Sequence, residues 1–315
     1  MNIMLAIAFL KKIRSFTVKI KQRLPFLFQI KEEKINEIDT AIANSNKRQM
    51  IYLGNNRALT TTIFGHSIFL DTRDISLTPH ILMKGFWEIW ITRVFIELIK
   101  KDMNVIEIGA NIGYYTTLAA SKVGQNGKVF AFEADPNTFE NLFHSIEVNG
   151  FLDRVTLVNT AVLEDDYQSI NFYSLEKHHG SNSISKFSAN SLERLHDSAN
   201  VINIAATSLD SFFHNQELKI DLIKIDAEGS EPRILRGMKG LIKDNPDLKI
   251  VCEFVPSILI SFGEEPDNFL DEIISFGFKL NKIDPYLGIV PTSRQELLTC
   301  NAYDLFLERD IKRNP

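Results

Sequence analysis

From about residue 100 onward, short apolar runs alternate with segments in which apolar residues recur at helical spacing. The helical spacing predicts helices over residues 114–122, 136–148, 208–213, 231–243 and 267–276. The apolar runs predict strands over residues 104–108, 128–133, 155–159, 220–226, 249–254, 278–283 and 303–308. Strands separated by helices indicate a parallel sheet with helices on both faces. Only a loop is predicted between the last two strands, so we expect them to pair as an antiparallel hairpin.

The first hundred residues show weaker patterns. Residues 1–48 look helical, and residues 86–99 carry apolar side chains at helical spacing. Three short strands are expected over residues 51–53, 61–64 and 67–70, with turns at Gly54 and Gly65. We therefore predict an N-terminal extension over residues 1–80 and an α/β domain over residues 81–315.

Composition narrows the class of protein. Of the 315 residues, 44% are apolar and 24% are charged, which is typical of a soluble globular protein. The net charge of −5 argues against a nucleic-acid partner. The two cysteines, Cys252 and Cys300, lie in apolar strand-like runs, so we expect buried thiols in a reducing, cytoplasmic compartment.

The N-terminus begins with ten mostly apolar residues, followed by Lys11, Lys12 and Arg14. This run is too short to span a membrane, and its charges follow the apolar stretch, unlike those of a signal peptide. A packed helix is the simpler interpretation. The alternative is a helix over residues 1–30 that touches a membrane surface weakly, which would make the protein membrane-peripheral.

The first predicted strand of the α/β domain ends in the sequence Glu-Ile-Gly-Ala-Asn-Ile-Gly. Gly109 and the small Ala110 would let the backbone approach a ligand, and Gly113 would let the next helix start close to the strand. Asn111 can bond the local backbone or the ligand. Glu107, within the strand, could pair with the ammonium of a cofactor's amino-acid portion. This turn predicts a nucleoside cofactor at the sheet edge.

A second acidic residue supports the cofactor site. Glu133 ends the next strand, 24 residues after Gly109, close to the offset of about 20 at which an acidic residue binds a ribose diol. Asp135 precedes Pro136 and is expected to cap the following helix, so we interpret it as structural. The small residues around Ala161, after the third strand, could line the adenine site.

Carboxylates also gather after the strand over residues 220–226. Asp226, Glu228 and Glu231 follow this strand, and Lys224 lies within it. A helix start explains Glu231 but explains Asp226 poorly, because Asp226 ends an apolar run. Glu253 ends the next strand at the same sheet edge. The polar stretch over residues 174–200, which includes His178 and His179, is expected to be a loop, either solvated or covering a substrate.

Together these motifs resemble the FkbM-type family of S-adenosylmethionine-dependent methyltransferases, over residues 66–310. The segments that carry the resemblance are Glu107–Thr116, Ala131–Pro136, Ala161–Val162, Thr207–Asp210, Lys224–Gly229 and Glu253, with Leu70–Asp74 and Gly85–Glu88 similar to the lead-in of some members. Ala134 departs from the pattern, since many members have proline there. The resemblance implies a Rossmann-like class I methyltransferase fold, in which a mostly parallel seven-stranded sheet ends in an antiparallel strand.

The resemblance also implies a function. We expect S-adenosylmethionine as cofactor and O-methylation of a hydroxyl on a sugar, glycan or natural-product acceptor. Asp226 is the candidate base, with Glu228 and Lys224 as catalytic partners; we expect no metal, although such carboxylates can hold a divalent ion. The alternatives are a nicotinamide-dependent oxidoreductase, which would need a Gly-x-Gly-x-x-Gly turn, and a non-catalytic nucleoside-binding domain.

Overall fold

The computed structural model describes Ile42 and residues 49–310 of the chain. The chain divides into two compact units, residues 1–47 and residues 48–315, and the fold described below is that of the second. The helices predicted within residues 1–48, including the membrane-surface helix over residues 1–30, lie outside the described residues. The domain boundary after residue 80 remains a prediction, and the second unit includes the short strands assigned to the extension.

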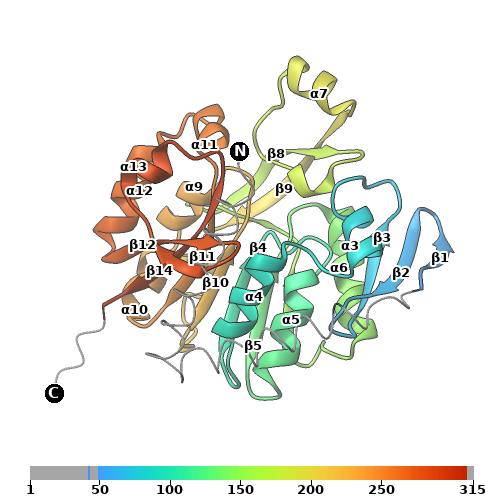
Figure 1. Ribbon diagram of the computed structural model, residues 1–315, viewed down its shortest axis with the longest axis horizontal. Coiled ribbons are helices and arrows are strands. Elements are labelled where there is room, and N and C mark those ends of the chain that lie inside the picture. Colours follow the sequence, from blue (N-terminus) through green and yellow to red (C-terminus); the bar gives the residue numbers. More distant parts are fainter. Residues whose placement is uncertain (1–41, 43–48, 311–315) are drawn as a thin grey trace, which may run out of the picture. The chain divides into compact units, whose positions relative to one another are not determined.

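An eight-stranded sheet forms the centre of this unit (Figure 1). All seven predicted strands are present, and one edge strand is additional. The last strand along the chain, β14, runs antiparallel to β11, as predicted, while β11, β10, β4, β5 and β6 are parallel. The strand order is β13 (Gly288–Pro291), β12 (Phe278–Asp284), β14 (Tyr303–Arg309), β11 (Lys249–Phe254), β10 (Leu222–Ile225), β4 (Asn104–Ile108), β5 (Lys128–Phe132) and β6 (Val155–Val158).

Helices cover both faces of this sheet, because the central strands are apolar on both sides. Val105 of β4 packs into one core and its neighbour Ile106 into the other. The first core is closed by α3 (Thr78–Lys84), α4 (Ile89–Leu98), α5 (Tyr114–Val123) and α6 (Pro136–Val148). The second is closed by α8 (Leu209–Phe212), α9 (Glu231–Arg236), α10 (Lys239–Asp244), α11 (Pro256–Ser261), α12 (Pro266–Ser275) and α13 (Arg294–Leu298).

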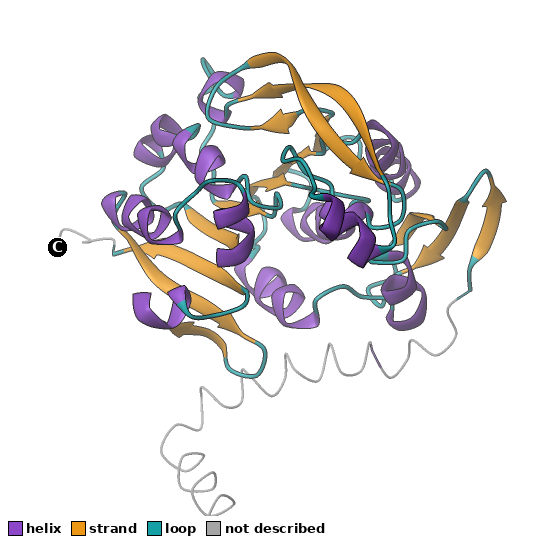
Figure 2. Ribbon diagram, turned by 90° about the horizontal axis from the view of Figure 1, so that it is seen from above, coloured by secondary structure: helices purple, strands orange, loops and turns teal. Residues whose placement is uncertain are grey.

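An insertion between β6 and α8 forms a sheet of its own (Figure 2). It contains β7 (Ala161–Val162), β8 (Tyr167–Leu175), the 3₁₀ turn η2 (His179–Ser181), α7 (Ala189–Leu195) and β9 (Ala199–Thr207). The expectation of a loop over residues 174–200 holds for residues 176–188 apart from the turn η2, but it is wrong at α7 and at the two ends, which belong to β8 and β9. The long strands β8 and β9 are mostly solvent-accessible, so they lack the apolar run that marks a buried strand.

A third sheet lies near the start of the unit. It consists of β1 (Ile51–Gly54), β2 (Arg57–Thr61) and β3 (Ser67–Asp71), all antiparallel neighbours. Strand β3 contacts α6, where the amide of Phe69 donates to Ser145 Oγ at 3.0 Å. The prediction of a strand over residues 61–64 is wrong, because the turn from Thr62 to His66 takes up these residues.

Two further predictions are corrected near the second core. The helix expected over residues 231–243 is broken into α9 and α10 at Gly237, which lies so close to Leu163 that a Cβ would be 2.1 Å from its carbonyl oxygen. The expected loop between β12 and β14 contains β13 and α13.

The structure also bears on two further predictions, that the thiols are buried and that no segment spans a membrane. Cys252 is buried in β11, whereas Cys300 is partly exposed, so the prediction of buried thiols holds for the first only. Burial raises the pKa of both thiols. Across Ile42 and residues 49–310, no helix combines the length and the apolar character that crossing a membrane requires.

Candidate functional site

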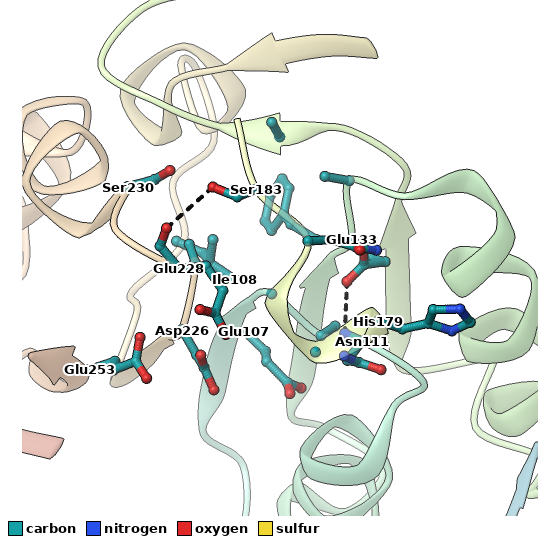
Figure 3. Close-up of a pocket in the computed structure, with 18 of the residues that line it drawn as sticks. Glu107, Ile108, Asn111, Glu133, His179, Ser183, Asp226, Glu228, Ser230 and Glu253 are labelled. Atoms are coloured by element: carbon teal, nitrogen blue, oxygen red, sulfur yellow. Dashed lines mark hydrogen bonds between the residues drawn. The ribbon is translucent and has the colours of Figure 1, made fainter. Parts of the chain in front are cut away.

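A cavity of about 300 Å³ lies at the carboxyl ends of the parallel strands (Figure 3). Its floor is the turn after β4, one wall follows β5, and the other follows β10 and β11. The insertion forms the roof. The cavity brings together the predicted site residues Glu107, Gly109, Ala110, Asn111, Glu133, Ala161, Lys224, Asp226, Glu228 and Glu253.

The turn after β4 has the backbone geometry that its glycines predict. Gly109 has φ of 78°, and a Cβ at this position would be 1.8 Å from the carbonyl oxygen of Asp226, so another residue cannot fit without movement. The amides of Gly109 and Ala110 both donate to the Phe132 carbonyl, at 3.0 and 2.9 Å. Gly113 does not line the cavity. It starts α5 with φ of 91°, and a Cβ there would meet Leu142 of α6 at 2.7 Å.

Glu133 faces this turn from the end of β5. Its Oε2 accepts from the Asn111 amide at 2.8 Å, and its Oε1 accepts from the Asp135 amide at 2.8 Å. Burial raises the pKa of this carboxyl to about 7. Because each carboxylate oxygen has two lone pairs, both can accept a further hydrogen bond from a ligand hydroxyl.

Glu107 lies beneath the turn and is almost completely buried. Its Oε2 accepts from Thr116 Oγ1 at 2.6 Å, and burial raises its pKa to about 8, while the positive charge of Lys224 acts in the opposite direction. A carboxyl with a pKa this high is mostly protonated at neutral pH, so the pairing of Glu107 with an ammonium stays a prediction.

A buried ion pair adjoins these residues. Lys224, 2% exposed, donates to Asp226 Oδ2 at 2.8 Å, and its ammonium lies 4.6 Å from the centre of the Tyr115 ring. Although burial disfavours its charged form, the surrounding carboxylates, first among them Asp226, raise the pKa of Lys224. Lys224 therefore holds one oxygen of Asp226, while the Asp226 side chain remains partly exposed in the cavity.

Two further carboxylates stand beside Asp226. Oxygens of Asp226, Glu228 and Glu253 all lie within 4.8 Å of one another (Figure 3). Burial and then the charge of Asp226 raise the pKa values of Glu228 and Glu253. These distances would suit a divalent ion, but carboxylates gather without one in many proteins, so the expectation of no metal stays a prediction.

The remaining acids and histidines noted in the sequence lie at helix starts, in the cavity lining or in the insertion. Glu231 is buried at the start of α9 and accepts from the Ala227 amide at 2.9 Å, which agrees with its interpretation as part of a helix start. Asp135 caps α6 by accepting from the Asn137 amide at 2.8 Å. His179 lines the cavity, whereas His178 pairs with Asp197 at 2.8 Å.

Residues that were not predicted as site residues also line the cavity. Glu88 lies just before α4 with φ of 36°, and its Oε2 accepts from the Tyr115 hydroxyl at 3.3 Å. Burial and then the charge of Asp226 raise its pKa to about 6. A left-handed glutamate is unfavourable and such residues gather at functional sites, but no sequence signal marks the conformation. Residues 179–184 also line the cavity, which agrees with the expectation that the polar stretch over residues 174–200 covers a ligand, although none of them was predicted as a site residue.

The chain belongs to the FkbM methyltransferase family, since the family model described as "Methyltransferase FkbM domain" matches residues 107–280. No curated protein matches the chain. The matched residues contain the turn after β4, Glu133, the insertion and the Asp226 cluster. The family identifies the protein as a methyltransferase with S-adenosylmethionine as cofactor, and this decides against the nicotinamide-dependent oxidoreductase.

Similar solved structures include a transferase-like protein from Pyrococcus horikoshii, with 16% identity over 82% of this chain and 73% of that one, at a TM-score of 0.42. Methyltransferase FkbM from Methylobacillus flagellatus has 15% identity over 66% of this chain and 44% of that one, at a TM-score of 0.39. TYW2 from M. jannaschii, solved with AdoMet, has 15% identity over 83% of this chain and 90% of that one, at 0.40. With TM-scores below 0.5, these likenesses add nothing to the family assignment.

The residues of the cavity fit this cofactor. The space above Gly109 and Ala110 is free of side chains from the turn, and Glu133 retains acceptor capacity for a ribose diol. The carboxyl groups of Glu107 and Asp226 lie at the same cavity and offer oxygen acceptors to a cofactor that carries both an ammonium and a sulfonium. Cofactor binding by Glu107, Gly109, Ala110, Asn111, Gly113, Glu133, Ala161 and Asp226 remains a prediction for each residue.

Proposed function

We propose that the protein is an O-methyltransferase that acts on a hydroxyl group of a sugar, glycan or natural-product acceptor. The observation that carries this proposal is the Asp226 carboxylate, which lines the cavity while its Oδ2 is held by the buried Lys224 at 2.8 Å. A hydroxyl must lose its proton as it attacks a methyl group, so such an acceptor needs a base at a fixed place.

In this proposal the two carboxylate oxygens of Asp226 have different roles. Oδ2 is bound to Lys224 at 2.8 Å, which fixes the orientation of the carboxylate. Oδ1 is the oxygen that takes the proton from the acceptor hydroxyl. Lys224 is too deeply buried to meet the acceptor, so we assign it a positioning role.

Glu228 and Glu253 form the wall next to Asp226, and Glu88 stands on the other side near Tyr115. Their carboxyl groups hold protons more tightly than usual, so they can donate hydrogen bonds to acceptor oxygens as well as accept them. The cofactor supplies the activated methyl group. The protein aligns the hydroxyl with it, an effect worth about 7–11 kcal/mol in favourable cases.

The test compares Asp226→Asn with Asp221→Asn, which changes the acid just before the same strand, away from the cavity. Transfer of labelled methyl from S-adenosylmethionine is measured over a panel of sugars, glycosides and phenolic natural products. We expect Asp226→Asn to lower kcat by about 100-fold or more, which is a far larger effect than its effect on cofactor affinity. Asp221→Asn should remain active.

The product distinguishes the reaction types. A methyl ether on oxygen, which survives mild base, agrees with the proposal, whereas methyl on nitrogen, carbon or a base-labile ester contradicts O-methylation of a hydroxyl. Full turnover by Asp226→Asn would remove Asp226 from the role of base. Assays with and without a chelator test the expectation that no metal is used.

A further inference from the structure

The roof of the cavity is a short strap, residues 178–184, that joins β8 to α7. Every residue from His179 to Ile184 lines the cavity. Figure 3 shows that the strap extends from the side of Asn111 and Glu133, where His179 lies, to the loop that carries Glu228, where Ser183 lies. Ser183 Oγ donates to the Glu228 carbonyl at 3.4 Å. The strap therefore spans both the predicted cofactor half and the Asp226 half of the site.

Asn182 fastens this strap. Its Nδ2 donates to Asp135 Oδ2 at 3.0 Å, and its Oδ1 accepts from the Leu175 amide at 2.7 Å. Ser174 of β8 donates to the same oxygen of Asp135. On the other side of Asn182, Ser183 exchanges two backbone hydrogen bonds with Tyr173, at 2.7 and 3.1 Å.

Asp135 links the strap to the predicted ribose-binding carboxylate. Its amide donates to Glu133 Oε1 at 2.8 Å, which fixes the orientation of Glu133. Its Oδ1 caps α6 by accepting from the Asn137 amide, and its Oδ2 receives the bonds from Asn182 and Ser174. One buried side chain, 1% exposed, therefore connects the cofactor wall, the start of α6 and the roof.

Capping of a helix does not account for this arrangement. A cap requires one side-chain oxygen, which accepts from an amide of the first helical turn. Here the second oxygen is buried and is satisfied by neutral donors of the insertion alone. Because a polar oxygen without a hydrogen-bond partner is costly to bury, the hydrogen bond between Asp135 and Asn182 stabilises both side chains in these positions.

We propose that Asp135 and Asn182 are positioning residues for cofactor binding: their hydrogen bond holds the strap over the cavity and Glu133 in its orientation. The inference rests on the assignment of this cavity to S-adenosylmethionine. Since residues 179–184 line the cavity from one end of the strap to the other, we expect the bond between Asn182 and Asp135 to slow dissociation of the cofactor.

The test measures association and dissociation of S-adenosylmethionine by stopped flow, together with hydrogen exchange of residues 176–187. In Asn182→Ala, which leaves the cap of α6 intact, we expect dissociation to be about tenfold faster or more, with little change in association. Hydrogen exchange of the strap should increase. Asp135→Asn should behave alike, because it keeps a cap acceptor but places an amide donor opposite Asn182.

The matched control is Ser188→Ala, which removes another side-chain cap of the insertion, at the start of α7 and away from the cavity. It should leave the dissociation rate within about twofold of the wild type. An unchanged rate in Asn182→Ala would overturn the proposal even if Asp135→Asn failed to fold. If the wild-type protein did not bind S-adenosylmethionine at all, the cofactor assignment itself would fall, which is a different result.

Discussion

At the residue scale, the site is defined by carboxyl groups that hold their protons unusually tightly. The pKa values of Glu133 and Glu107 are raised by burial to about 7 and about 8, and Lys224 is the one basic Lys or Arg side chain among the residues that line the cavity. A cavity lined by several carboxyl groups and one basic side chain favours ligands that bring positive charge or hydroxyl donors, as S-adenosylmethionine does.

The affinity for S-adenosylmethionine should therefore depend on pH. Below the raised pKa values, Glu133 and Glu107 are protonated and accept hydrogen bonds or pair with an ammonium less well. We expect the affinity to rise about tenfold between pH 6 and pH 8. Calorimetry at each pH, in two buffers with different ionisation enthalpies, would also detect the released protons. An affinity that stays constant in the wild type would contradict these protonation states.

Glu107 should also make stability depend on pH. Its pKa is raised from 4.5 to about 8 in the folded protein, so the folded state binds more protons than the unfolded state between these values. Its contribution to stability is complete below about pH 4.5 and is lost as the pH rises to about 8. Glu107→Gln, which cannot ionise, should gain stability relative to the wild type as the pH rises.

Urea unfolding of the cofactor-free protein at pH 5 and pH 8 measures this difference. Glu217→Gln, at an exposed position, is the control, and its difference from the wild type should not change between the two pH values. A constant difference for Glu107→Gln as well would show that Glu107 is ionised throughout.

At the element scale, the strands buried on both faces could be predicted and the exposed ones could not. Residues 249–254 were predicted as a strand with the bounds that β11 has, because an apolar run on a parallel strand is unbroken. Strands β8 and β9 alternate irregularly, since they pair with each other and bury little against either core. Their pairing is fixed by contacts between residues about thirty positions apart.

The turn after β4 gives a prediction at this scale. Gly109→Ala places a Cβ at 1.8 Å from the Asp226 carbonyl and also strains a positive φ, whereas Gly150→Ala strains a similar φ, 71°, in open space. We expect Gly150→Ala to cost about 1 kcal/mol of unfolding free energy and Gly109→Ala at least about 3 kcal/mol. If the two substitutions lowered the unfolding free energy equally in urea titrations, the turn at Gly109 would not contact the Asp226 carbonyl as described.

At the scale of the whole molecule, the strand order decides which residues form the site. Strands β4 and β10 are neighbours with Glu107 opposite Lys224, although more than a hundred residues separate them. The order also places Glu253 beside Asp304 of the antiparallel β14. Burial raises the pKa of Asp304 to about 8, with the charge of Glu88 as the next cause, so the last strand places a further carboxyl group next to Glu253, although Asp304 itself does not line the cavity.

Residues 48–315 contain the sheet, both cores and every described residue that lines the cavity. We therefore expect a protein comprising these residues to bind S-adenosylmethionine with a dissociation constant within about threefold of that of the full chain. Calorimetry on both proteins under one condition makes the comparison. Loss of binding in the shorter protein would show that residues 1–47 take part in the cofactor site.

The sequence by itself determined the parallel strands, the glycine turn after β4 and the carboxylates at the strand ends, because each depends on a local pattern of apolar, small or acidic residues. It also sufficed to place Glu133 and Asp226 at one sheet edge, since parallel strands align their carboxyl ends. The tertiary structure alone decided the roles of Glu88, Asn182 and the second oxygen of Asp135. These roles come from contacts between distant segments and from backbone conformations that no local pattern specifies.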